Sequence, residues 1–156
     1  MNGLNGNSWA RGLSVLVTGG TQGIGKAVAE QFLRLGAKVT VTGTRSHIDC
    51  YDDPPDGVAY LQADLTWPEA RAEVAAHIDH LDVLVNNAGR GSPREYEQEE
   101  FEHVIDTNLN AVMDLSVRLH PLLKETKGSI VNVGSLASFL ALKETPAYTA
   151  SKAGLL

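Results

Sequence analysis

The chain has 156 residues, of which 43% are hydrophobic and 21% charged, enough for one globular domain with its own core. A net charge of −6 argues against a nucleic-acid-binding surface. No apolar stretch approaches the roughly 20 residues that a membrane-spanning helix needs. The single cysteine, Cys50, excludes an internal disulfide, so we expect a reducing compartment, the cytoplasm.

The first dozen residues are polar and rich in glycine and asparagine, without the apolar segment of a secretory signal. We interpret residues 1–12 as a flexible lead-in. Residues 13–156 contain no linker, internal repeat or low-complexity tract. We therefore expect them to form one domain.

Strand and helix patterns alternate along this domain. The patterns predict strands at 13–18, 38–42, 58–62, 81–85 and 128–134, and helices at 23–35, 68–78, 98–125 and from 146 onward. Pro121 should kink or end the long third helix early, and the last helix should still continue at Leu156. Segment 45–57 contains Pro54, Pro55 and four aspartates, so it should be a loop. The alternation predicts an α/β fold, a doubly wound parallel sheet with helices on both faces.

A glycine-rich turn, Thr-Gly-Gly-Thr-Gln-Gly-Ile-Gly at 18–25, joins the first strand to the first helix. Gly19, Gly23 and Gly25 permit a tight turn and close approach of the backbone to a pyrophosphate. The helix N-terminus then offers free N–H groups to the phosphates. The spacing differs from Gly-x-Gly-x-x-Gly, and a glycine-rich turn without a ligand is the alternative interpretation.

Tyr148 and Lys152 are four residues apart, one helical turn, so their Cβ atoms should lie about 5–6 Å apart on one face. A cation this close favours the ionised phenolate, which makes a tyrosine usable as a proton donor and acceptor near neutral pH. The pair alone is a weak signal because chance produces it often.

Together these motifs resemble the short-chain dehydrogenase/reductase family over nearly all of residues 13–156. The family's glycine turn, its acidic residue near the adenine and its Asn-Asn-Ala-Gly element match Gly19, Gly23, Gly25, Asp64 and residues 86–89. Its catalytic residues match Asn108, Ser135, Tyr148 and Lys152. The resemblance implies a Rossmann-type three-layer fold. It also implies a cofactor site made of Gly19, Thr21, Gln22, Gly23, Ile24, Gly25, Thr44, Arg45, Ser46, Asp64, Leu65, Asn87, Ala88, Gly89, Tyr148 and Lys152.

The resemblance also implies a role for each catalytic residue. Tyr148 would exchange a proton with the substrate oxygen, and Lys152 would acidify Tyr148 and hold the nicotinamide ribose. Ser135 would hydrogen-bond the substrate carbonyl, and Asn108 would hold a water in the proton relay. Taken singly, Ser135 could equally be a plain hydroxyl after a strand, and Asn108 a satisfied buried amide.

The cofactor choice depends on the end of the second strand. A carboxylate there would bond the adenosine ribose 2′-hydroxyl and repel a 2′-phosphate. This position holds Gly43, followed by Thr44, Arg45 and Ser46, which favours NADP(H) over NAD(H). The uncharged Gln22 and the aspartate-rich loop weaken that preference, so NAD(H) stays the alternative.

The sequence departs from the family in two places. Loop 45–57 replaces the helix usually found between the second and third strands, beside the adenine end of the site. The sequence also stops four residues after Lys152, without the family's C-terminal strands, which favours an incomplete sequence. The strand at 128–134 would then present an open apolar edge.

We expect an oxidoreductase that transfers a hydride between NADP(H) and a small-molecule carbonyl or secondary alcohol, with tyrosine as the proton donor. The alternative is a truncated, non-catalytic nucleotide-binding or interaction module. The resemblance implies a homo-oligomer for the full-length family member, with the last and the long helices at the subunit interface. No metal site is expected, because the pair His77 and His80 lacks a third ligand.

Overall fold

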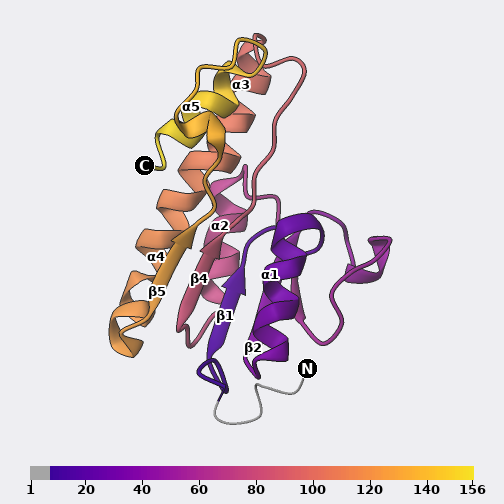
Figure 1. Cartoon of the computed structure of the whole chain (residues 1–156), viewed down its shortest axis with the longest axis vertical. Coiled ribbons are helices and arrows are strands. Elements are labelled where there is room, and N and C mark those ends of the chain that lie inside the picture. The colour runs from indigo at the N-terminus through magenta and orange to yellow at the C-terminus, as the bar shows by residue number, and fades with distance from the viewer. Residues whose placement is uncertain (1–7) are drawn as a thin grey trace.

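The computed structural model describes residues 8–156, which form one parallel sheet between two layers of helices (Figure 1). The strands are β1 (Ser14–Val17), β2 (Lys38–Gly43), β3 (Ala59–Gln62), β4 (Val83–Asn86) and β5 (Ser129–Asn132). Their order across the sheet is β3-β2-β1-β4-β5. The Rossmann-type, doubly wound α/β fold expected from the sequence is confirmed. The order reverses at β1, and open α/β sheets bind ligands at such a switch point, outside the carboxyl ends of the strands.

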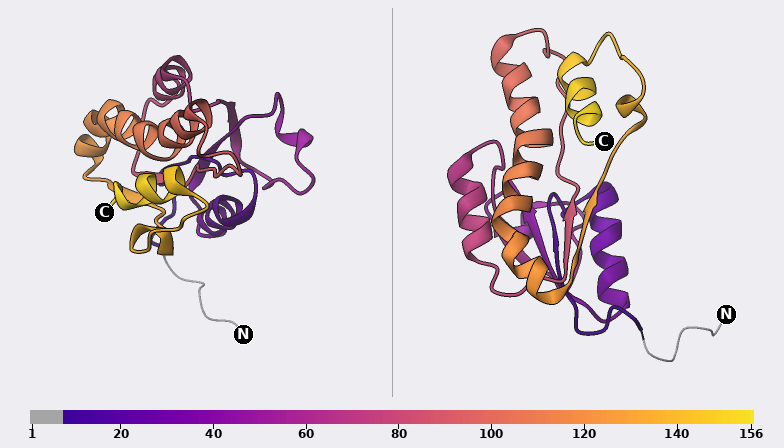
Figure 2. Two further views of the ribbon diagram at one scale, coloured as in Figure 1. Left: turned by 90° about the horizontal axis from the view of Figure 1, so that it is seen from above. Right: turned by 90° about the vertical axis from the view of Figure 1, so that its left-hand side faces the viewer.

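Helices cover both faces of the sheet, as Figure 2 shows. Helix α1 (Gly23–Arg34) packs on one face, against Val15 and Val17 of β1. Helices α2 (Pro68–Ala76) and α4 (Ala111–Thr126) pack on the other face, against Leu16. Successive side chains of a strand point to opposite faces, so the run Val-Leu-Val supplies both cores. Such continuous apolar strands are typical of a parallel sheet buried on both faces.

The long helical run expected at 98–125 is present, but it is interrupted. Helix α3 (Gln98–Ile105) passes into a π-helical turn, η2 (Asp106–Asn110), and then into α4. The prediction that Pro121 ends the helix early is wrong: α4 continues to Thr126. Leu119 and Leu123 are buried on either side of the proline, and this packing offsets the lost hydrogen bond.

Two loop regions flank the sheet. Segment 45–57 contains no α-helix, as predicted, and only a short 3₁₀ turn, η1 (Ile48–Cys50). Of the interval 1–12, expected to be a flexible lead-in, the first seven residues lie outside the described part. Residues 8–12 form a turn in which Ala10 is fully buried and the N–H of Gly12 donates to the carbonyl oxygen of Gly36.

The last strand leads through a 3₁₀ turn, η3 (Leu136–Ser138), to helix α5 (Pro146–Ala153). The prediction that this helix continues to the last residue is wrong, since Gly154, a poor helix former, follows its end. Strand β5 lies at the edge of the sheet, and its Ile130 and Val131 are 42% and 47% exposed. The open apolar edge predicted for this strand is therefore present. No helix of residues 8–156 has the length and apolar character to cross a bilayer.

The core contact of α4 can be tested by truncation. Leu119→Ala should lower the free energy of unfolding by about 2–5 kcal/mol, because it leaves a cavity beneath the sheet. Val117→Ala on the same helix is the matched control, since Val117 is 59% exposed. Its effect should stay within about 0.5 kcal/mol. Urea unfolding followed by circular dichroism measures both, and equal losses would contradict this packing.

Candidate active site

A cleft of about 560 Å³ lies at the carboxyl ends of the central strands. Twelve of the sequence-predicted cofactor residues line it: Gly19, Thr21, Gln22, Gly23, Ile24, Gly25, Thr44, Asp64, Leu65, Asn87, Ala88 and Gly89. The cleft therefore lies at the switch point of the sheet, between the ends of β1 and β4. Four predicted residues do not line it: Arg45, Ser46, Tyr148 and Lys152. The guanidinium of Arg45 lies 4.6 Å over the ring of Tyr51, and Ser46 Oγ lies 3.7 Å from Cys50 Sγ.

The glycine turn leaves room for a bulky anionic group. Gly19 and Gly23 have positive φ angles of 62° and 57°, which side chains other than glycine rarely adopt. A Cβ at Gly25 would lie 2.4 Å from both Gly19 O and Asn87 Nδ2, so the helix start packs tightly on β4. A Cβ at Gly23 would meet nothing within 4 Å, and the first turn of α1 has no side-chain cap. This open cradle of free N–H groups fits the diphosphate of a dinucleotide.

Hydrogen bonds from Thr18 and Asn87 hold the strand ends around this turn. Thr18 Oγ1 accepts the N–H groups of Asn87 and Ala88, both at 3.0 Å. Asn87 Nδ2 donates to the carbonyl oxygens of Thr18 and Gly19 at 2.9 and 3.1 Å. The Gly19 N–H donates to Thr42 Oγ1 at 3.1 Å. The Asn-Asn-Ala-Gly element thus fixes the glycine turn through its side chain and its backbone.

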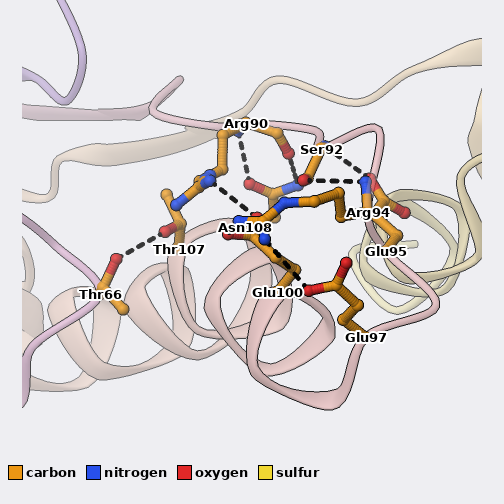
Figure 3. A network of polar contacts seen from close by, with 9 residues as sticks. All are labelled: Thr66, Arg90, Ser92, Arg94, Glu95, Glu97, Glu100, Thr107 and Asn108. Carbon is orange, nitrogen blue, oxygen red and sulfur yellow. Dashed lines mark hydrogen bonds and ion pairs between the residues drawn. The ribbon is translucent and has the colours of Figure 1, made fainter.

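Asn108 lies in the π turn and is fully buried (Figure 3). Its Oδ1 accepts the Arg90 N–H at 2.8 Å, and its Nδ2 donates to Arg90 O at 2.8 Å and to Ser151 Oγ at 3.1 Å. The side chain therefore joins the long helical run to the loop after β4 and to α5. A π turn inserted in a helix often marks a functional position.

Tyr148 is positioned by two polar contacts near the start of α5. Its N–H donates to the buried carboxylate of Glu95 at 2.9 Å, and that carboxylate also accepts the Ser92 N–H at 3.0 Å. Its carbonyl oxygen accepts a hydrogen bond from Ser151 Oγ at 2.7 Å. The carboxylate thus satisfies an N–H at the positive end of the helix. The sequence motifs do not identify Glu95 or Ser151, because the side chains of both hold the backbone of Tyr148 and take no part in a motif.

Lys152 is only 5% exposed, and none of the ion pairs among residues 8–156 includes it. Its Nζ donates to Val133 O at 2.8 Å and lies 5.8 Å from the centroid of the Tyr148 ring. The same atom lies 3.7 Å from where a Cβ would stand at Gly89, a residue that lines the cleft, although Lys152 itself does not line it. Burial lowers the pKa of Lys152 below its usual value. A perturbed buried cation beside a cleft is typical of a functional site.

Ser135 follows β5 and begins η3. Its Oγ accepts the Ala137 N–H at 3.2 Å. No hydrogen bond of the described residues joins it to Tyr148. The structure therefore connects Asn108, Tyr148 and Lys152 into one arrangement, through Ser151 and the loop after β4. Ser135 lies after β5, at the start of η3, outside this arrangement.

A comparison with known families shows to which family the chain belongs. The family model described as short chain dehydrogenase matches residues 14–156, so the chain belongs to the short-chain dehydrogenase family. A tropinone reductase homolog of Arabidopsis thaliana is 35% identical over 158 residues, which cover 92% of this chain and 60% of that protein.

Solved structures show the same fold. The ligand-free aldohexose dehydrogenase of Thermoplasma acidophilum superposes with a TM-score of 0.84 at 30% identity, over 96% of this chain and 60% of that one. A metagenomic short-chain oxidoreductase in complex with NADP superposes with a TM-score of 0.80 at 34% identity, over 96% and 72%. The chain thus spans about 60% of the length of the reductase homolog and of the aldohexose dehydrogenase.

Because Lys152 is buried, we expect the free energy of unfolding to depend on pH. Because the pKa of Lys152 is lower in the folded state, the unfolded chain binds this proton more tightly. The resulting destabilisation is fully present below the folded pKa and disappears as the pH rises toward 10.5, the unperturbed value. The free energy of unfolding of the wild type, relative to Lys152→Met, should therefore rise as the pH rises toward 10.5. Urea unfolding at each pH measures this difference, and a flat or falling difference would contradict it.

Proposed function

We propose that the chain is an oxidoreductase that transfers a hydride between NADP(H) and a small-molecule carbonyl or secondary alcohol. The observation that carries this proposal is the buried ammonium of Lys152 beside Tyr148 and near Gly89, which lines the cleft. A buried cation without an acidic partner destabilises a fold, so its place there favours a functional role. The names of the similar proteins, a reductase homolog and a dehydrogenase, agree with this reaction class.

Each polar group would have its own task in the reaction. The nicotinamide would supply or accept the hydride. Reduction builds negative charge on the substrate oxygen, so donors aimed at that oxygen stabilise the transition state. Tyr148 would donate the proton. Ser135 Oγ accepts only a backbone N–H, so its own hydrogen would be free for the same oxygen.

Lys152 and Asn108 would complete the proton path. Lys152 Nζ has three hydrogens and donates one to Val133 O, which leaves two for the ribose hydroxyls and for Tyr148. Both amide hydrogens of Asn108 are donated within the protein. A relay water would therefore donate to the second lone pair of Asn108 Oδ1. That atom and Lys152 Nζ both lie near Gly89, at 3.4 and 3.7 Å from a Cβ built there.

NADP(H) is proposed in preference to NAD(H). Gly43, at the end of β2, supplies no carboxylate to repel a 2′-phosphate, and Arg45 supplies a cation nearby. The similar metagenomic oxidoreductase was solved in complex with NADP. NAD(H) is the alternative cofactor.

One observation favours a second candidate function. The chain spans only about 60% of the length of two of the similar proteins. A chain of this extent could be a nucleotide-binding or interaction module without catalytic activity. Turnover separates the two candidates, because both predict nucleotide binding and only the first predicts substrate conversion.

The proton-donor role of Tyr148 is tested by removing its hydroxyl. Tyr148→Phe should lower kcat by about 10²–10⁴-fold, the usual contribution of general acid–base catalysis, with little change in cofactor affinity. The absorbance of the reduced nicotinamide, followed with a panel of ketones and secondary alcohols, measures turnover.

Tyr96→Phe is the matched control, since Tyr96 is 76% exposed and its hydroxyl donates to Lys143 O at 2.7 Å. It should leave kcat within about twofold. An unchanged rate in Tyr148→Phe would eliminate this mechanism. Nucleotide binding by the wild type without turnover of any substrate in the panel would favour the second candidate.

A further inference from the structure

The residues that follow β2 carry two backbone N–H groups that meet at one oxygen. Thr44 N and Arg45 N donate to the hydroxyl of Tyr51 at 2.9 and 3.1 Å. Tyr51 follows η1, is 8% exposed, and lines the cleft together with Gly43 and Thr44. The end of the second strand is where dinucleotide-binding folds recognise the 2′ group of the adenosine ribose. Successive amides that converge in this way form a site for an anionic oxygen.

Gly43 is required by this tyrosine. A Cβ at Gly43 would lie 2.5 Å from the Tyr51 hydroxyl oxygen and 2.8 Å from Thr21 Cγ2. Any side chain at this position, a carboxylate included, would expel the phenol from the amides. The need for space around the Tyr51 phenol is therefore sufficient to explain why Gly43 stands where a carboxylate would bind the ribose 2′-hydroxyl. A 2′-phosphate is not needed to explain it.

The cations near this position are also engaged by the same loop. The guanidinium of Arg45 stacks at 4.6 Å over the Tyr51 ring and donates to the carbonyl oxygen of Cys50. The ammonium of Lys26, in the first turn of α1, contacts Asp53 at 2.5 Å and Glu30 at 3.2 Å. Lys26, Arg45, Tyr51 and Asp53 line one depression of about 260 Å³ beside the glycine turn. The Tyr51 phenol thus occupies the two amides and contacts Arg45, and the Asp53 carboxylate contacts Lys26. A bound phosphate monoester would need the same amides and cations.

The environment of Tyr51 stabilises negative charge on oxygen. Burial raises the pKa of this phenol, but hydrogen bonds with Arg45, Thr21, Tyr60 and Thr44 together outweigh burial, and the net pKa lies below the usual value for tyrosine. A phosphate oxygen placed on the same donors would gain from the same interactions.

We infer that segment 48–53 acts as an internal ligand of the 2′-phosphate subsite, with Tyr51 as a specificity-determining residue that lowers the affinity for NADP(H) relative to NAD(H). The inference rests on the proposed dinucleotide-binding function and deepens it: the lack of an acid at Gly43 favours NADP(H), and Tyr51 reduces that preference. NAD(H), whose ribose carries a 2′-hydroxyl, binds with the segment in place. NADP(H) binds only in exchange for it, because the 2′-phosphate and the phenol need the same two amides.

Binding constants for NADP⁺ and NAD⁺, measured by titration calorimetry on the whole chain, test the inference. Tyr51→Phe retains the ring but frees both amides, so the segment leaves more easily. We expect about tenfold tighter binding of NADP⁺, equivalent to the loss of one or two competing hydrogen bonds, and a change below about twofold for NAD⁺. Asp53→Asn should tighten NADP⁺ binding less, by about twofold, because Asp53 is 86% exposed and its ion pair with Lys26 is screened.

Tyr96→Phe is the matched control. Tyr96 is 76% exposed, and its hydroxyl donates to Lys143 O at 2.7 Å, away from segment 48–53. It should leave the ratio of the two binding constants unchanged. If both nucleotides bind and Tyr51→Phe leaves that ratio at its wild-type value, the inference is wrong and the proposed function stands. If neither nucleotide binds to the wild type or the variants, both fail.

Hydrogen exchange on the wild-type chain gives a second measurement that needs no variant. The N–H groups of Cys50 and Tyr51 donate to His47 O and Ile48 O within the 3₁₀ turn. Saturation with NADP⁺ should increase exchange of the peptide that contains residues 48–53, and saturation with NAD⁺ should not. Equal exchange with both nucleotides would overturn the inference, even if Tyr51→Phe does not fold.

Discussion

The ammonium of Lys152 is held where three segments distant in the sequence meet. Among residues 8–156, Val133, just after β5, supplies its hydrogen-bond acceptor, and Gly89, after β4, lies beside it. Helix α5 supplies the lysine itself. An ammonium buried in this way opposes folding, because a single carbonyl oxygen does not replace its hydration shell. The surrounding structure must therefore fix α5 firmly enough to keep the charge in place.

That fixation comes from polar groups that bond to backbone atoms. Asn108 bridges both backbone groups of Arg90 to Ser151, and Ser151 in turn bonds the carbonyl of Tyr148. Glu95 holds the N–H of Tyr148 from the other side of the helix start. The π turn around Asn108 is part of this arrangement, because the added residue rotates the helical run and directs the amide toward α5. Tyr148 and Lys152 thus share one rigid support, although only eight residues form their helix.

The sequence predicted the fold and the glycine turn well, for reasons that are local. The apolar run of β1, the glycines at 19, 23 and 25, and the Pro146 helix start are each encoded by neighbouring residues. Contacts between distant segments could not be predicted in the same way. Pro121 was expected to kink its helix or end it early, and the buried Leu119 and Leu123, packed under the sheet, explain why the helix does not end there. The buried position of Glu95 depends on α5, far away in the chain.

Loop 45–57 is a second case in which a contact made in the folded chain could not be predicted from the sequence. This contact changes how the residues at the end of β2 are interpreted. From the sequence, Gly43 in place of an acid and Arg45 two residues later favour NADP(H). In the folded chain, the space above Gly43 is filled by the phenol of Tyr51, and Arg45 stacks on its ring. A missing carboxylate therefore has two physical causes that the motif alone does not separate: room for a phosphate, or room for a side chain of the protein that occupies the phosphate's donors. The free energy that decides between NADP(H) and NAD(H) then includes the displacement of this segment as well as contacts with the nucleotide.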